Sequence, residues 1–104
     1  IHAGHIDLLE RAKKKGDKLI VGINSDRSVR AIKGNNRPFQ NQEERKKILE
    51  NLKPVDEVMI FDELTPELLI KKIKPDVLIK GGDWKEKEII GSDFVLKSGG
   101  EVMS

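Results

Sequence analysis

Short apolar runs alternate with helical segments along the whole chain of 104 residues. Four runs have the length and composition of buried strands, at residues 18–23, 57–61, 76–80 and 101–103. Apolar residues at helical spacing predict helices at residues 6–15, 27–32, 42–53 and 86–97, and a further one between Pro66 and Pro75. Strands that alternate with helices indicate an α/β fold: a Rossmann-like parallel sheet with right-handed crossovers and helices on both faces.

Local signals predict several helix boundaries. Asn41 followed by Glu44 is a capping-box pattern, so Asn41 is expected to cap the start of its helix. Thr65 is expected to cap the next helix, with Pro66 as its first residue. The segment 33–38 breaks all periodicity, which predicts a loop between two helices.

The chain has room for one domain, residues 1–104, with a core of modest size. A helix that opens with an anion-binding turn normally follows a strand, yet only Ile1 precedes the first turn here. The last predicted strand also stops at Ser104. We therefore expect a fragment truncated at both ends, which lacks the first central strand of its sheet and a C-terminal segment.

Composition limits the classes of partner. Charged residues make up 37% of the chain, above the ~25% typical of soluble domains, but 20 basic and 18 acidic side chains nearly cancel. The net charge of +2 gives no basic excess of the kind expected for binding nucleic acid or a membrane surface. The absence of cysteine fits a reducing cytoplasm, and no apolar run approaches the ~20 residues that span a bilayer. We expect neither nucleic acid nor membrane as a partner.

Both histidines of the chain, His2 and His5, stand three residues apart at the start of the first predicted helix. This spacing puts the two imidazoles on one face of its first turn. The N–H groups and positive dipole end of the helix attract an anion, Gly4 lets it approach the backbone, and each imidazole can donate to a phosphate oxygen. The pattern indicates a phosphate site. Taken alone, it also fits solvated surface residues, a remnant of an expression tag, or half of a zinc site that no cysteine or third histidine would complete.

Polar and glycine-rich residues follow three of the predicted strands, at residues 24–26, 61–63 and 80–84. The carboxyl ends of parallel strands meet at one edge of a sheet, where α/β folds bind their ligands. The sequence therefore predicts a functional site at this edge.

The chain resembles the nucleotidyltransferase family with the H-x-G-H signature, which includes cytidylyltransferases and adenylyltransferases, over essentially all 104 residues. Within that family it is most similar to adenylyltransferases that convert heptose 1-phosphate to ADP-heptose for lipopolysaccharide core synthesis. The likeness lies in residues 2–12 (HAGHIDLLERA), 22–26 (GINSD), 33–34, 37–38, 44–45, 55–58 (VDEV), 65–66 and 75–83 (PDVLIKGGD). An H-x-G-H motif alone would be a weak signal, whereas this ordered series is fairly specific.

The resemblance implies transfer of AMP from ATP to heptose 1-phosphate with release of pyrophosphate, and Mg²⁺ that enters with the triphosphate. The residues it implies as catalytic are His2, His5 and Lys33. The residues it implies as nucleotide-binding are Gly4, Asp26, Arg45, Gly81, Gly82 and Asp83. It implies no metal site built by the protein alone, and it points to a sugar kinase, fused or separate, while unpaired sheet edges would favour a homo-oligomer.

Two nucleotide-binding parts of the family fall outside these residues. One is the upstream strand, which ends in a Gly-x-Phe-Asp type of sequence, and the other is a downstream turn rich in Ser and Thr. Residues 1–104 alone therefore need not be active. The alternative functions are a CTP-dependent cytidylyltransferase of the glycerol-3-phosphate type and a non-catalytic nucleotide-binding module.

Several of the implied residues also have simpler interpretations. Lys33 would fit a solvated lysine, and Arg45 an exposed arginine paired with a neighbouring glutamate. Gly81 and Gly82 would suit a plain tight turn. Asp26, like Asp83, could cap the helix that follows it.

Overall fold

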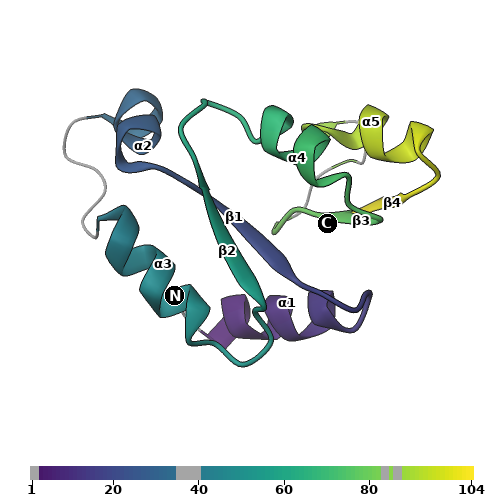
Figure 1. The fold of residues 1–104 in the computed structure, drawn as a ribbon, viewed down its shortest axis with the longest axis horizontal. Helices are drawn as coiled ribbons and strands as arrows, with labels where there is room; N and C mark the ends of the chain where they lie inside the picture. Colours follow the sequence, from purple (N-terminus) through teal and green to yellow (C-terminus); the bar gives the residue numbers. More distant parts are fainter. Residues whose placement is uncertain (1–2, 35–40, 83–84, 86–87) are drawn as a thin grey trace.

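The computed structural model of the chain describes residues 3–34, 41–82, 85 and 88–104, apart from the side chain of Lys33. Helices and strands alternate along these residues, which confirms the predicted α/β class (Figure 1). The elements are α1 (Ala3–Lys13), β1 (Ile20–Asn24), α2 (Asp26–Lys33), α3 (Gln42–Glu50), β2 (Glu57–Phe61), α4 (Glu67–Ile73), β3 (Val77–Ile79), α5 (Ser92–Lys97) and β4 (Glu101–Met103).

The strands pair in parallel, as the sequence predicts, but in two separate sheets. Strand β1 pairs with β2, in a register that sets Ile20 opposite Glu57. Strand β3 pairs with β4, with Val77 opposite Glu101. One continuous sheet was expected, and the described strands do not form it. Each of the four described strands pairs on one side only.

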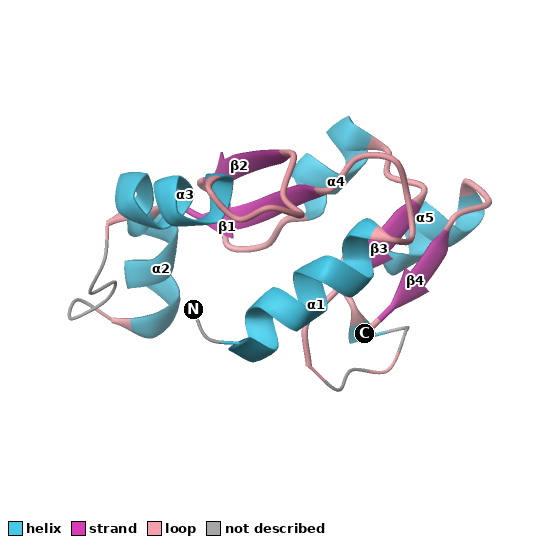
Figure 2. Ribbon diagram, turned by 90° about the horizontal axis from the view of Figure 1, so that it is seen from below, coloured by secondary structure: helices cyan, strands magenta, loops and turns pink. Residues whose placement is uncertain are grey.

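Helix α1 contacts both strand pairs. At its last residue, Lys13 donates a hydrogen bond to the Asp56 carboxylate just before β2. In its first half, the side chain of Leu8 packs on Gly81, which follows β3. Figure 2 shows α1 running alongside both pairs. This one helix therefore sets the position of the carboxyl end of β3 relative to the first strand pair.

Several predicted boundaries are confirmed and others are wrong. Strand β2 covers the predicted residues, and Asn41 caps α3 by accepting a hydrogen bond from the Glu44 amide at 2.8 Å. The predicted cap at Thr65 is wrong, because α4 begins one residue late and its N-cap is Pro66. Helix α5 begins only at Ser92, since Gly91 before it has a left-handed backbone (φ 88°) that ends any earlier helical run.

The largest buried cluster lies in the second half of the molecule. It consists of Ile70, Ile89, Val95 and Val102, against which Leu78 and Phe94 pack. Helix α5 contacts both β3 and β4, whereas α3 contacts β1 and β2. In the first half, the buried apolar residues are Val55, Val58 and Phe61.

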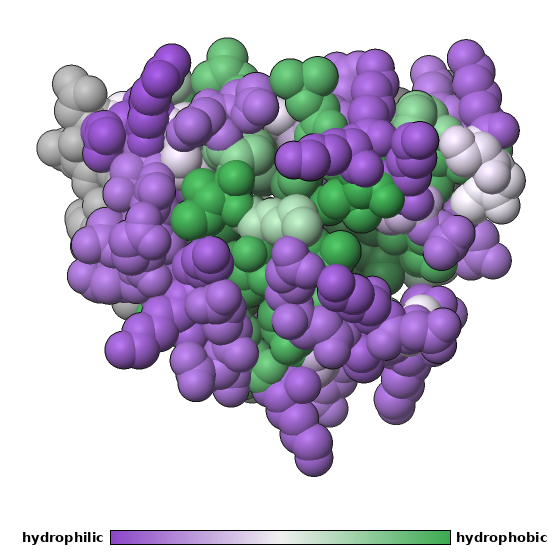
Figure 3. Space-filling view, in the orientation of Figure 1, coloured by the Kyte–Doolittle hydropathy of each residue, from purple (hydrophilic) through white to green (hydrophobic). Residues whose placement is uncertain are grey.

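Apolar side chains also reach the surface. Leu64 and Leu68 are 60% and 62% exposed, and Ile32 is 54% exposed. All the apolar residues of β1 and β3 remain half-buried. Figure 3 shows hydrophobic residues across the middle of one face, framed by hydrophilic ones. The described residues therefore do not enclose a single closed core.

Candidate functional site

The middle of α1 packs beside the turn that follows β3. Gly4 and His5 lie in the first turn of α1 and are exposed. Leu8 follows three residues later, on the same side of the helix as His5. Its Cδ2 atom is 3.0 Å from the position that a Cβ would take on Gly81. The predicted anion-binding turn therefore lies about one helical turn from the contact between Leu8 and Gly81.

The turn after β3 extends the second strand pair. The Lys80 amide donates a hydrogen bond to the Met103 carbonyl at 3.1 Å. Gly81 and Gly82 are both exposed, and Gly82 has a left-handed backbone with φ 103°. A side chain on Gly81 would press on Leu8, so glycine there permits the close approach of α1. Both the turn and the ligand interpretations of these glycines are compatible with this geometry.

A buried polar network lies where β1 and β2 end. Ser25 and Ser28 are 2% and 1% exposed. Ser25 is the N-cap of α2, and its hydroxyl accepts a hydrogen bond from the Ser28 amide at 3.2 Å. The Ser28 hydroxyl accepts from Asn24 Nδ2 at 2.9 Å and donates to the Glu63 carbonyl at 2.8 Å. Burial of these groups is tolerated because they hydrogen-bond to one another, and the network ties α2 to both strand ends.

Asp26 and Arg45, predicted separately as nucleotide-binding residues, contact each other. Arg45 Nη2 lies 3.2 Å from Asp26 Oδ1 and 2.8 Å from the Asn24 carbonyl oxygen. Both side chains are 21% exposed. The capping interpretation of Asp26 is wrong, because Ser25 is the cap and Asp26 is the first helical residue. The interpretation of Arg45 as an exposed arginine paired with a neighbouring glutamate is also wrong.

Gln42 was missed by the sequence analysis as part of this arrangement. Its Oε1 atom accepts a hydrogen bond from the Asp26 amide at 2.9 Å. Ser25 and Ser28 were missed as well. A Ser at the end of a strand followed by Ser three residues on is a local capping signal that could have been found. The Gln42 contact spans sixteen positions and has no local signal.

Some predicted residues fall outside the described part of the chain. These are His2 and Asp83, together with Trp84 and the side chain of Lys33. Lys33 is the last residue of α2. Gly34, which follows it, has a positive φ of 96° and ends the helix. The structure therefore brings together Asp26 with Arg45, and α1 with Gly81.

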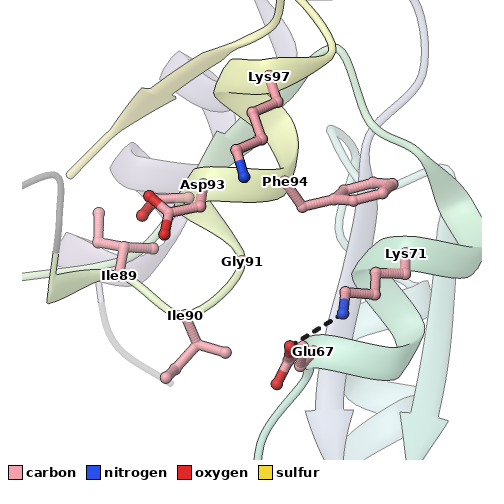
Figure 4. Close-up of a pocket in the computed structure, with 9 residues that line it drawn as sticks. Glu67, Lys71, Ile89, Ile90, Gly91, Asp93, Phe94 and Lys97 are labelled. Carbon is pink, nitrogen blue, oxygen red and sulfur yellow. Dashed lines mark ion pairs between the residues drawn. The ribbon is translucent and has the colours of Figure 1, made fainter.

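Two hollows, each of about 420 Å³, lie away from the predicted site residues. One is open between α4 and α5, where Ile90 and Phe94 meet the ion pair of Glu67 with Lys71 (Figure 4). The other lies at the amino ends of β3 and β4. Neither hollow is lined by a residue that was predicted to bind nucleotide.

The opposite end of the first strand pair carries an electrostatic link. The Asp56 carboxylate accepts hydrogen bonds from Lys13 Nζ and, at 2.7 Å, from the Leu19 amide. These bonds lower the pKa of Asp56 below its ordinary value. Lys18 pairs with Glu57 at 2.9 Å, and that hydrogen bond raises the pKa of Lys18. The Leu19–Asp56 bond and the Lys18–Glu57 pair join the start of β1 to the start of β2, and Lys13 adds the end of α1; all lie at the other end of the strands from Asp26.

Within the described ranges, no three His, Cys, Asp or Glu side chains lie close enough to hold a metal ion. None of the helices in the described part of the chain has the length and apolarity needed to cross a membrane.

Comparison with known families gives a match over most of the chain. The family profile described as cytidylyltransferase-like matches residues 1–95. Among solved structures, the lipopolysaccharide core biosynthesis protein from Thermoplasma volcanium GSS1 has a similar fold, with a TM-score of 0.76 and 27% sequence identity. The match covers 99% of this chain and 85% of that chain. It supports the predicted Rossmann-like architecture.

Curated relatives are more similar in sequence but much longer. The chain is 56% identical over 95 residues to the bifunctional protein HldE of Wolinella succinogenes, a match that covers 91% of this chain and 20% of that protein. It is 51% identical over 102 residues to the bifunctional protein HldE of Koribacter versatilis, covering 98% of this chain and 21% of that protein. The chain thus spans about a fifth of the length of the curated relatives it matches.

Proposed function

Because the chain belongs to the cytidylyltransferase-like family, we propose that it transfers AMP from ATP to heptose 1-phosphate, releasing pyrophosphate and giving ADP-heptose for lipopolysaccharide core synthesis. The family supports a nucleotidyltransferase, and the similar solved structure, a lipopolysaccharide core biosynthesis protein, supports a role in lipopolysaccharide synthesis. The choice of ATP and of heptose 1-phosphate rests on the similarity of the sequence motifs.

The observation that carries the proposal is the packing of Leu8 on Gly81. Leu8 follows His5 by about one helical turn, so this contact supports a position of the first turn of α1 close to the carboxyl end of β3. The positive end of a helix and the ligand edge of a parallel sheet then border the same space. A triphosphate bound there would contact the helix N-terminus while its nucleoside lies along the Gly81–Gly82 turn. Exposure of Gly4 and His5 leaves this space accessible.

In the proposed reaction, an oxygen of the sugar 1-phosphate attacks the α-phosphorus of ATP, and the bond to the β-phosphate oxygen breaks as pyrophosphate leaves in line. Both reacting groups are already anionic at neutral pH, so no general base is needed. The protein's part is to align the two phosphates and to stabilise the negative charge that builds on the α-phosphoryl oxygens.

Each predicted residue has a role in this proposal. His2 and His5 donate hydrogen bonds to the triphosphate at the start of α1, and Lys33 supplies a further positive charge. Gly4, Gly81 and Gly82 let nucleotide approach the backbone. Asp83 binds a ribose hydroxyl or reaches the Mg²⁺ that enters with the triphosphate. Asp26 and Arg45 contact the nucleotide from the end of β1, where the guanidinium has N–H groups beyond the one that Asp26 and Asn24 engage.

The proposal also concerns the rest of the protein. The division into two strand pairs supports a further central strand between β1 and β3, so that residues 1–104 form one domain that other segments complete. Because the relatives are named bifunctional and are about five times as long, we propose a sugar kinase fused to this domain. Open sheet edges and the apolar face in Figure 3 support a homo-oligomer. We place the protein in the cytoplasm.

Pyrophosphate release by the full-length protein tests the proposal. The assay compares ATP with CTP, each with heptose 1-phosphate or glycerol 3-phosphate. Release with ATP and heptose 1-phosphate is the expected result. Release only with CTP and glycerol 3-phosphate would mean that the substrates differ from those proposed, although the type of reaction is the same. Binding of ATP by calorimetry without release for any pair would instead indicate a non-catalytic nucleotide-binding module.

A further inference from the structure

Asp26 is held on two sides by the first turn of α3. Its backbone amide donates to Gln42 Oε1 at 2.9 Å, and its carboxylate accepts from Arg45 Nη2 at 3.2 Å. Gln42 and Arg45 are three residues apart and therefore share one side of α3. The contacts span sixteen and nineteen positions of the chain, so they reflect the tertiary fold and not the local sequence.

The Gln42 contact is separate from the network that fixes α2. Ser25 caps that helix, and Ser28 ties it to the Glu63 carbonyl, so the helix has its own attachment to both strand ends. The Asp26 amide, however, belongs to the first turn, whose N–H groups have no partner within the helix. Gln42 supplies that partner from outside. Its side chain therefore holds the N–H side of the peptide group between Ser25 and Asp26, whose carbonyl accepts a hydrogen bond from the Val29 amide at 2.9 Å.

We infer that Gln42 is a positioning residue for nucleotide binding: it fixes the Asp26 peptide while Arg45 fixes the Asp26 carboxylate. The inference rests on the proposed function, in which Asp26 contacts the nucleotide. Without the Gln42 contact, the Ser25 carbonyl stays bonded to Val29, but the Asp26 N–H loses its acceptor, and the position of Asp26 relative to α3 then depends on the Arg45 contact. Loss of this preorganisation weakens binding of the nucleotide and leaves the chemical step at the α-phosphorus largely unchanged.

The test uses the full-length protein with Gln42→Met, which keeps the length of the side chain and removes the oxygen acceptor. KM for ATP is expected to rise roughly threefold to tenfold, the range expected from one net hydrogen bond, with kcat within about twofold of wild type. Gln42→Glu keeps an acceptor oxygen and is expected to restore most of the affinity. Glu43→Ala is the matched control, because it removes only the 3.1 Å bond from Gln42 Nε2 and leaves the Asp26 contact intact.

Thermal unfolding of each variant separates positioning from stability. The inference expects melting temperatures within about 2 °C of wild type for Gln42→Met. It is overturned if Gln42→Met leaves KM for ATP unchanged, if Gln42→Glu is as impaired as Gln42→Met, or if the rise in KM only follows a fall in melting temperature. A wild-type protein that releases no pyrophosphate from ATP would instead overturn the proposed function, and this inference with it.

Discussion

The two strand pairs of the molecule are stabilised in different ways. The β1–β2 pair ends in a polar network in which Ser25 and Ser28 are buried and Asn24 is half-buried, and Val58 and Phe61 are its buried apolar residues. The β3–β4 pair packs on the cluster around Val95, which is 0% exposed, and hydrogen bonds between side chains play little part there among the described residues.

The two strand pairs therefore depend on different kinds of interaction. Directional hydrogen bonds hold the end of β1, where Arg45 contacts the Asn24 carbonyl and the Asp26 carboxylate. Apolar packing, which is less directional, suffices to present the Gly81–Gly82 turn on a stable support. Helix α1 joins the two halves, because it contacts Asp56 at one end and Gly81 in its first half.

Loss of a histidine at this junction should have the largest effect. His5→Ala and His2→Ala in the full-length protein should each lower the rate of pyrophosphate release by roughly a hundred- to a thousandfold, because each removes a donor that stabilises transition-state charge. Steady-state kinetics with ATP and heptose 1-phosphate measure it. Asp7→Ala, at an exposed residue that pairs with Arg11 at 3.3 Å, is the control and should stay close to wild type. Equal rates for wild type and both histidine variants would place the chemistry elsewhere.

The second-largest effect is expected from overpacking the cluster around Val95 in the second half of the molecule. A Cβ on Gly100 would lie 2.6 Å from the Asp76 carbonyl oxygen and 2.7 Å from Val95 Cγ1, so Gly100→Ala forces the backbone to move. We expect a loss of about 2 kcal/mol in the free energy of unfolding, measured by urea denaturation. Gly16→Ala, where no heavy atom lies within 4 Å of the new Cβ, should be neutral or slightly stabilising. An unchanged free energy of unfolding for Gly100→Ala would show that the second half is not close-packed.

Breaking the polar network should cost somewhat less. Ser28→Ala leaves Asn24 Nδ2 and the Glu63 carbonyl without their partner, at a cost of about 1 to 2 kcal/mol in the free energy of unfolding. Ser98→Ala is the matched control, since Ser98 is exposed and bonds only to the Phe94 carbonyl at 3.0 Å. Similar losses from both serine variants would mean that burial of the network contributes nothing, and the contrast between the halves would disappear.

The smallest effect should come from loss of the Asp56 charge, and it should disappear in acid. The pKa of Asp56 is lowered in the folded protein, so its ionised form stabilises the fold above the ordinary aspartate pKa of about 3.9, and this stabilisation is lost as the pH falls through the folded value. Asp56→Asn should therefore melt below wild type at neutral pH, and the difference should shrink below about pH 4. Asp62→Asn, at an exposed aspartate after β2, serves as the control. A difference that stays constant down to low pH would rule out this titration.

Local signals in the sequence predicted the elements better than their assembly. Strand β2 and the Asn41 cap follow from residues within one turn or one strand, and both are confirmed. Helix α5 was predicted too long, because apolar spacing around Ile89 and Ile90 resembles a helix while the left-handed backbone of Gly91 interrupts it. The split into two strand pairs depends on which strands are neighbours, and periodicity carries no information about that.

The same limit applies to the site. The sequence pointed to Asp26 and Arg45 individually, but it could not show that they contact each other, since nineteen positions separate them. Gln42 was seen only as part of a capping pattern, and its bond to the Asp26 amide appears only in the folded chain. The packing of α1 on Gly81 likewise depends on a contact between Leu8 and a turn far along the sequence.

The fate of the α-phosphate tests the central claim most directly. The full-length protein is incubated with heptose 1-phosphate and ATP that carries a radioactive α-phosphate, and the products are separated. Nucleotidyl transfer at the junction of α1 and the Gly81 turn predicts that the label appears in the sugar nucleotide and not in pyrophosphate, and that His5→Ala nearly abolishes this product. Absence of label from any sugar product, or undiminished transfer by His5→Ala, would contradict the account.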